Sequence, residues 1–387
     1  MDVASSASKG PLLVRYRGDE RRVEVDVPGL GEPLFWESET LPFAALGSDF
    51  AALAALPAAM ATARDLHVEG RLDSELARNL ANISSFWAQW RPGVYSAIRI
   101  SADELVEARP ARCGEGWALC LSGGVDSTFA LLDNAARPPG LGYPIPTGLF
   151  VHGFDYPLDR IDAVETLLAS IRGPARFAGA KIAVVRTNWK TALCRQGPAD
   201  WGHMFPLGLA AILHLFAGGH RGGLIASDCT FREDHEIAPV GNNPATNRML
   251  SSAAFPIQPL GERTSRMDKI AGIARLGFLA DVNVCWQGPR TGRNCSECDK
   301  CLRTMFLCEA AAIDPSPAFG RRLSAARLAR MRIVSPSDYL FIKKAVSDYS
   351  PEADPKLRRA ARIPLARFEL RRAARVAKRL ALGRPLR

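Results

Sequence analysis

Short apolar runs and amphipathic stretches alternate along the chain from residue 117 onward. The apolar runs predict buried strands, and apolar positions that recur every three or four residues predict helices between them. After a first strand that begins at Trp117, the pattern predicts strands at 147–152, 181–187 and 223–226 and helices at 129–137, 158–171, 205–217 and 265–276. Strands that alternate with helices form a parallel sheet with helices on both faces, so we expect a doubly wound α/β fold.

The first hundred residues show a different order of elements and are expected to form a separate α+β extension. Their alternating positions predict two paired strands, and longer apolar stretches predict two helices before a third strand. The ranges are 12–17 and 22–27 for the pair, 50–63 (interrupted at Pro57) and 73–90 for the helices, and 94–100 for the last strand. The chain thus divides into an N-terminal domain (1–110), a central domain (111–310) and a helical C-terminal region (311–387).

Of the net charge of +10, residues 351–387 hold +9, because they contain 12 Lys/Arg and 3 Asp/Glu and leave 38 basic and 37 acidic residues elsewhere. A helix with arginines around an apolar side is expected from Leu365 to Leu382. Such a helix suits contact with RNA, an anionic membrane surface or a partner protein. A solvated terminal helix, or one covered in a homodimer, is the simpler interpretation.

No targeting or membrane segment is apparent in the sequence. The N-terminus lacks the apolar run of a signal peptide, and the most apolar helix, 205–217, is too short to span a bilayer. The nine cysteines are unevenly placed, which argues against a secreted disulfide framework. We therefore expect a cytoplasmic protein.

The segment Ser122-Gly123-Gly124-Val125-Asp126-Ser127 joins the strand at Trp117 to the next helix. Adjacent glycines let the backbone approach a ligand closely, and the helix presents free N–H groups and the positive end of its dipole. With two serine hydroxyls, these groups form a cradle suited to phosphate. Asp126 would repel phosphate, so we expect it to hold a divalent cation that bridges to the phosphates. A glycine-rich turn without a ligand is the alternative.

Polar residues also follow the later strands, and parallel strands direct their carboxyl ends to one edge of a sheet. We expect Asp155 and Asp228 to be functional for this reason. Each also has a simpler interpretation as a helix or turn cap.

Four cysteines, Cys285, Cys295, Cys298 and Cys301, have the spacing of a metal site. Four thiolates suit a tetrahedral structural zinc ion. An iron–sulfur cluster is the main alternative, and buried free cysteines or a redox pair are further ones. Cys308 is expected to face a helix core.

The loop at 122–127 resembles the PP-loop of the ATP pyrophosphatases, which include asparagine synthetase, GMP synthetase, NAD synthetase and 7-cyano-7-deazaguanine synthase. These enzymes share Ser-Gly-Gly-x-Asp-Ser after the first strand of a doubly wound sheet, and all six positions match here. The cysteine segment 284–304 is similar to the zinc segment of 7-cyano-7-deazaguanine synthase. The resemblance covers about residues 116–307 and fails between Ala238 and Leu250, where that family holds its substrate.

The resemblance implies an adenine-nucleotide alpha-hydrolase-like fold, with ATP, Mg²⁺ and Zn²⁺ as cofactors. Residues 122–127 would bind the phosphates, with Asp126 and Ser127 also serving in catalysis. Asp155 would lie on the nucleotide side and Asp228 on the metal or substrate side. The resemblance leaves the substrate open, and Arg232, Arg248, Arg263 and Lys269 are candidate partners, because of their charge, for a substrate carboxylate or the departing pyrophosphate.

The implied reaction is adenylation of a small-molecule carboxylate or amide, with release of pyrophosphate and attack by ammonia or an amine. No glutaminase signature is visible, because Met1 is not followed by Cys. One alternative is a tRNA-modifying enzyme of the thiolation type, with an iron–sulfur cluster in place of zinc and RNA bound by the basic tail. The other is a non-catalytic nucleotide-binding protein.

Overall fold

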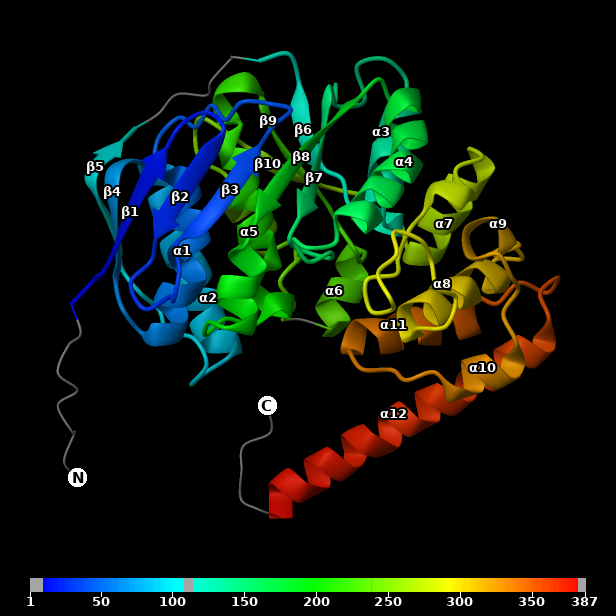
Figure 1. Cartoon of the computed structure of the whole chain (residues 1–387). Coiled ribbons are helices and arrows are strands. Elements are labelled where there is room, and N and C mark those ends of the chain that lie inside the picture. The colour runs from blue at the N-terminus through cyan, green and yellow to red at the C-terminus, as the bar shows by residue number, and fades with distance from the viewer. Residues whose placement is uncertain (1–9, 108–113, 238, 382–387) are drawn as a thin grey trace.

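A ten-stranded, mostly parallel sheet forms the centre of this α/β protein (Figure 1). The structure is a computed structural model that describes residues 10–107, 114–237 and 239–381. The strand order is β10-β9-β6-β7-β8-β3-β2-β1-β4-β5. The strands are β1 (Leu12–Gly18), β2 (Arg22–Asp26), β3 (Leu34–Ser38), β4 (Leu66–Asp73), β5 (Ile100–Val106), β6 (Trp117–Cys120), β7 (Thr147–His152), β8 (Lys181–Thr187), β9 (Gly222–Ala226) and β10 (Ile257–Leu260).

Twelve α-helices accompany the sheet in the described ranges. They are α1 (Asp49–Thr62), α2 (Ser74–Trp90), α3 (Val125–Ala135), α4 (Ile161–Phe177), α5 (Trp201–Leu215), α6 (Phe231–Ile237), α7 (Arg266–Arg275), α8 (Asp299–Ala310), α9 (Ser316–Phe319), α10 (Ala325–Arg330), α11 (Pro336–Ser347) and α12 (Pro355–Ala381).

The parallel strands β6, β7 and β9 are buried on both faces, which explains their continuous apolar runs. In β6, Ala118 and Cys120 point into a core shared with α1, α2 and α5, whereas Leu119 points into a second core with α3 and α4. In β9, Leu224 and Ile225 divide between the two cores in the same way. The helices thus cover both faces of the sheet, as the sequence pattern predicts for this part of the chain.

The N-terminal strands continue the same sheet. β3 pairs antiparallel with β8, with Trp36 opposite Thr187 and Ser38 opposite Val185. β2 and β1 follow antiparallel, and β4 and β5 then run parallel to β1. The expected separate extension therefore shares its hydrogen-bonded ladder with the central part, and the expected boundary at 110/111 falls outside the described residues.

Several expected elements differ from the structure. The strand expected at 94–100 was wrong, because the strand here is β5, which begins at Ile100. The sequence pattern also missed β3, β4 and β10. The helix α1 continues through Pro57, and α3 begins at Val125 rather than Phe129, so that it incorporates half of the glycine loop.

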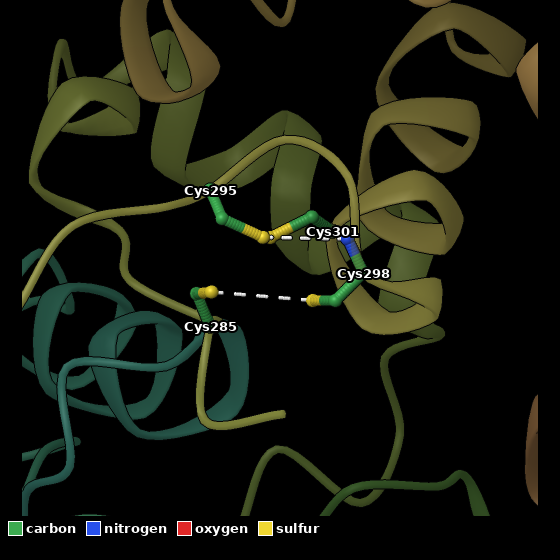
Figure 2. Close-up of side chains that lie close together, drawn as sticks. All are labelled: Cys285, Cys295, Cys298 and Cys301. Carbon is green, nitrogen blue, oxygen red and sulfur yellow. Dashed lines mark hydrogen bonds between the residues drawn. The ribbon is translucent and has the colours of Figure 1, made fainter. Parts of the chain in front are cut away.

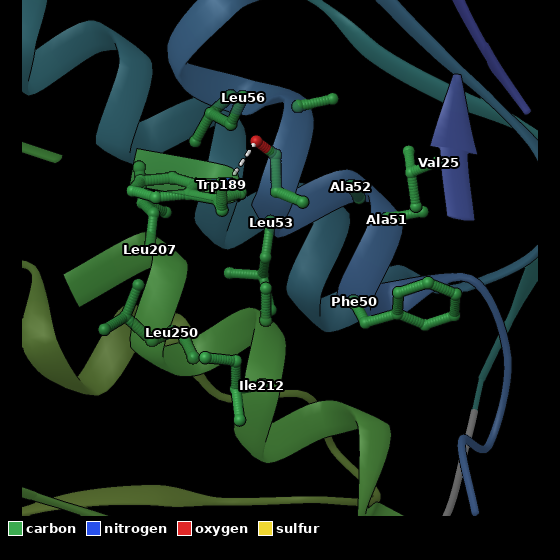
Figure 3. Packing of buried hydrophobic residues seen from close by; sticks show 14 of the residues in the cluster. Val25, Phe50, Ala51, Ala52, Leu53, Leu56, Trp189, Leu207, Ile212 and Leu250 are labelled. Atoms are coloured by element: carbon green, nitrogen blue, oxygen red, sulfur yellow. Dashed lines mark hydrogen bonds between the residues drawn. The ribbon is translucent and has the colours of Figure 1, made fainter. Parts of the chain in front are cut away.

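The largest core lies between α1, α5 and the N-terminal strands, as Figure 3 shows. Small alanines along α1 allow α5 to pack closely against it, and Trp189 fills the space beside Leu56 and Leu207. The indole Nε1 of Trp189 donates to the carbonyl of Ala54 at 3.1 Å, so its polar atom is satisfied inside the core. This core joins the N-terminal and parallel halves of the sheet.

A third core joins α3 and α7 to the C-terminal helices α8 to α12. Phe368 is the last large side chain of α12 buried in it, and residues 369–378 are exposed. The basic end of α12 accordingly extends beyond the body of the molecule (Figure 1). No helix in the described ranges has both the length and the apolar character needed to cross a bilayer.

Candidate functional site

The order of the parallel strands defines a crevice between β6 and β9. From β6 the chain proceeds to β7 and β8 on one side, then returns past β6 to form β9 and β10 on the other. Such a reversal places a ligand crevice beyond the carboxyl ends of the two strands at which the order switches. The loop 122–127 follows β6 and Asp228 follows β9, so both flank this crevice.

The glycine loop is held by its own hydrogen bonds. Gly123 has φ +76°, and a Cβ there would lie 2.9 Å from Cγ1 of Ile171, so both backbone and packing require glycine. The Ser122 amide donates to the Ser127 hydroxyl at 3.2 Å, and the two hydroxyls lie 3.2 Å apart. Gly124 is the N-cap of α3, and no described side chain caps the helix. The first-turn N–H groups therefore remain available to a ligand.

Asp126, in the first turn of α3, is bound by two cations from α7. Arg266 donates to one carboxylate oxygen, and Nζ of Lys269 lies 3.3 Å from the other. Burial alone would raise the pKa of Asp126, but Arg266 and Lys269 outweigh this effect and hold it below the usual value. Asp126 is therefore ionised and paired with two cations, and the expectation that it holds a divalent cation stays a prediction.

The pKa of Asp228 is shifted in the opposite direction, above the ordinary value for an aspartate. Burial raises its pKa, and the nearby charge of Asp126 adds to the increase against the opposing effect of Arg266. Its Oδ1 is buried without a hydrogen-bond partner among the described residues. Asp234 lies in the same acidic group, and burial with the charges of Asp228 and Glu233 raises its pKa to about 7. An unpaired carboxylate oxygen beside a second carboxylate is chemically suited to a cation.

Three adjoining cavities open at this edge of the sheet. The first, of about 280 Å³, is mainly apolar and lies between the loop and aromatic residues that include Phe154 and Trp201. The second, of about 90 Å³, lies directly against residues 122–127 and also contacts Arg303. The third, of about 540 Å³, extends toward Arg91 and α11. Asp155 lines the first two, and Asp228 lines the first and third.

The four cysteines converge beside the second cavity. Cys285 and Cys295 come from a loop, and Cys298 and Cys301 lie at the start of α8 (Figure 2). The Cys285–Cys298 and Cys295–Cys301 Sγ distances are 4.0 and 3.9 Å, and all four sulfurs lie within 4.8 Å of one another. A Cβ at Gly288 would lie 2.7 Å from the Cys285 sulfur, so the loop closes tightly around the group. These four thiolates could hold a metal ion such as zinc.

The structure brings together the predicted residues of the loop, Asp155, Asp228 and the cysteines. Lys269 contacts Asp126 but is fully buried and lines none of the three cavities, so it is not placed to bind a ligand directly as expected. Arg232, Arg248 and Arg263 line none of the three cavities, and Arg248 instead donates to Gln258 at 2.6 Å and Glu262 at 3.1 Å. Cys308 is buried in the third core, as expected.

Sequence analysis missed four residues of the site: Arg266, Trp286, Lys300 and Arg303. Arg266 lies one helical turn before Lys269 on α7, so the sequence spacing alone could have placed the two cations on the same face of the helix. Trp286 and Lys300 each adjoin a cysteine of the metal group, but nothing in the sequence places that group against the glycine loop. Comparison with protein-family models, curated proteins and solved structures found no match.

Proposed function

We propose that this chain is a PP-loop ATP pyrophosphatase with an adenine-nucleotide alpha-hydrolase-like fold. It would adenylate a small-molecule carboxylate or amide, which ammonia or an amine then attacks. The observation that carries the proposal is the position of the loop 122–127, with the N-terminus of α3, at the crevice between β6 and β9. Arg266, Lys300 and Arg303 add positive charge at the same place, which suits a polyphosphate.

The cavities offer a fitting place for each part of ATP. The first cavity suits adenine, because its walls are apolar and aromatic, and Asp155 at its edge suits the ribose. The second cavity suits the phosphates, since it is lined by the loop and by guanidinium groups. The third is large enough for an acceptor and meets the other two beside Arg266 and Asp228.

In the proposed reaction, an oxygen of the acceptor attacks the α-phosphorus, and the bond to the bridging oxygen breaks to release pyrophosphate. The N–H groups of the loop and the α3 dipole stabilise the charge on the leaving group, together with Arg303. Arg266 and Lys269 keep Asp126 ionised and hold the first turn of α3 against α7. The amine then attacks the activated carbon and displaces AMP.

Mg²⁺ fits beside Asp228, whose unpartnered carboxylate oxygen would hold the ion. The negative charge of nearby Asp126 would add to the attraction. When bound, the ion would neutralise phosphate oxygens. Few protein ligands are needed, because Mg²⁺ usually retains waters and binds substrate phosphates.

Zinc is the ion that we propose for the cysteine group. Tetrahedral coordination with Zn–S bonds of about 2.3 Å separates the sulfurs by about 3.8 Å, close to the observed 3.9 and 4.0 Å. An iron–sulfur cluster of four irons attaches each thiolate to a different iron, which requires sulfurs that are farther apart. Four thiolates also complete the coordination shell, so the zinc would have a structural role.

Pyrophosphate release from ATP, screened with carboxylic acids and ammonia, tests the proposal. With an active acceptor, Asp228→Asn should lower the rate by about 100-fold. Asp159→Asn, an exposed aspartate after β7, is the matched control and should leave the rate unchanged. The proposal is wrong if no acceptor yields pyrophosphate and the protein also fails to bind α,β-methylene-ATP.

A tRNA-modifying enzyme is a second candidate, favoured by the exposed basic end of α12. Arg372, Arg375 and Lys378 are all exposed there. Under this candidate, replacing all three with Gln should abolish co-purification of RNA while the melting temperature stays unchanged. Absence of RNA from the wild-type protein would count against it.

A further inference from the structure

Trp286, Lys300 and Arg266 are the residues that line all three cavities of the site. They therefore mark the junction at which nucleotide, phosphates and acceptor would meet. Two of them are direct neighbours of metal-group cysteines, because Trp286 follows Cys285 and Lys300 precedes Cys301. The four-cysteine group is thus connected to the junction through two separate segments of the chain, one at Cys285 and one at Cys301.

Lys300 differs from the other cations of the site in its partners. Arg266 and Lys269 pair with Asp126, and Arg303 pairs with Asp338. Lys300 pairs with no carboxylate among the described residues, and its ammonium instead lies 5.1 Å from the ring centroid of Trp286. A cation without a partner, placed between three cavities, is available to an anionic ligand.

Two lysine ammonium groups, of Lys300 and Lys190, lie near the Trp286 ring. Nζ of Lys190 lies 5.4 Å from the Trp286 ring centroid and donates to the carbonyl of Phe154 at 2.8 Å. The carbonyl of Trp286 accepts from Nε of Arg290 at 2.8 Å. The Trp286 ring therefore contacts Lys190, which follows β8, while Lys300 is next to Cys301 of the four-cysteine group.

We propose that the cysteine-bound metal positions Lys300 at the junction, where its ammonium binds a phosphate of the nucleotide. This inference rests on the proposed binding of ATP. The metal would join the loop that carries Trp286 to the first turn of α8, and so hold the ammonium against the ring and toward the second cavity. Loss of the metal would free both segments and weaken nucleotide binding without altering the sheet.

Binding of α,β-methylene-ATP with Mg²⁺, measured by calorimetry, tests the role of Lys300. Lys300→Met should weaken binding by about 10-fold, with unchanged zinc content and melting temperature. Lys343→Met removes the same charge from an exposed position on α11 and should have no effect. Binding by Lys300→Met at the wild-type affinity would overturn the assignment.

Removal of zinc from the wild-type protein and from Lys300→Met tests whether the metal acts on nucleotide binding through Lys300. Chelation should weaken nucleotide binding by the wild-type protein and have little further effect on Lys300→Met, since the two changes act through one contact. Circular dichroism and thermal melting of the chelated proteins establish that the sheet stays folded. If chelation weakens both proteins by the same factor, or unfolds the sheet, the positioning role is wrong. If zinc-loaded wild-type protein binds no nucleotide, the proposed function fails, and this inference fails with it.

Discussion

Nζ of Lys269 lies 3.3 Å from Oδ1 of Asp126 and is completely buried, so this pair ties α7 to the first turn of α3. Lys269 also donates to the carbonyl of Ser227, immediately before Asp228. One side chain therefore joins the two strand ends that flank the crevice. This makes Lys269 a positioning residue as well as a source of charge.

Removing this contact should destabilise the protein. Lys269→Met leaves a buried carboxylate with one of its two cations, and we expect a loss of about 1–3 kcal/mol in the free energy of unfolding. Urea denaturation measures the loss. Lys344→Met is the control, because Lys344 pairs with Asp348 at 2.7 Å but both side chains are about 40% exposed, and exposed pairs contribute less than about 1 kcal/mol. Equal losses in the two variants would contradict a structural role for Lys269.

The two loop glycines should respond differently to alanine. Gly123→Ala places a side chain at φ +76° and against Ile171, and should cost about 2–4 kcal/mol of stability. At Gly124 the φ is −76°, and the nearest atom to a new Cβ is Oγ of Ser122 at 3.4 Å. Gly124→Ala should therefore fold normally, yet weaken binding of α,β-methylene-ATP because its methyl group lines the second cavity. Unchanged binding by Gly124→Ala would show that phosphate does not approach this part of the loop.

Gly288 should be essential for metal affinity. A Cβ there would lie 2.7 Å from the sulfur of Cys285 and 2.8 Å from that of Cys295. Gly288→Ala should therefore displace these sulfurs and weaken zinc binding, which competition with a chromophoric chelator can measure. Gly31→Ala provides the control, because no atom of the described residues lies within 4 Å of the added Cβ. Zinc affinity equal to that of the control would mean that the loop can move aside at no cost.

The raised pKa of Asp234 predicts that stability depends on pH. The pKa of Asp234 in the folded protein is about 7, above the ordinary 3.8. The folded protein therefore binds the proton of this carboxyl group more tightly than the unfolded chain does. The resulting stabilisation is complete below 3.8 and is lost as the pH rises through 7. Thermal melting between these pH values should show this loss in the wild type but not in Asp234→Asn. Asp159→Asn should behave like the wild type, and a persistent slope in Asp234→Asn would assign the effect to another group.

The strands β6, β7 and β9 could be predicted because they are buried on both faces, which leaves short apolar runs in the sequence. The strand β8 could be predicted from its alternation of buried and half-buried residues. The missed strands lack such continuous apolar runs. β10 contains Pro259, which is compatible with an edge strand, and β4 is interrupted by a bulge between Val68 and Arg71. The position of β3 depends on antiparallel pairing with β8, a distant segment.

The candidate site could be predicted where it depends on strand ends. The loop and Asp228 follow neighbouring strands, so topology alone places them together. Lys300 and Trp286 belong to segments far along the chain, and their approach depends on the packing of α7 and α8 in the third core. Hydrophobic periodicity contains no information about that packing. The pairing of Asp126 with Arg266 could not be predicted for the same reason.

The antiparallel pairing of β3 with β8 also affects solubility. Without β3, the parallel half would end at β8 with a row of unpaired N–H and C=O groups, and such open edges recruit strands from other molecules. The two outer edge strands of the sheet, β10 and β5, each contain residues that disfavour pairing with a further strand. These are Pro259 in β10 and the adjacent acidic residues Asp103 and Glu104 in β5. The N-terminal strands therefore close an edge of the parallel half that would otherwise be open to strand addition, a role that does not require them to contact any ligand.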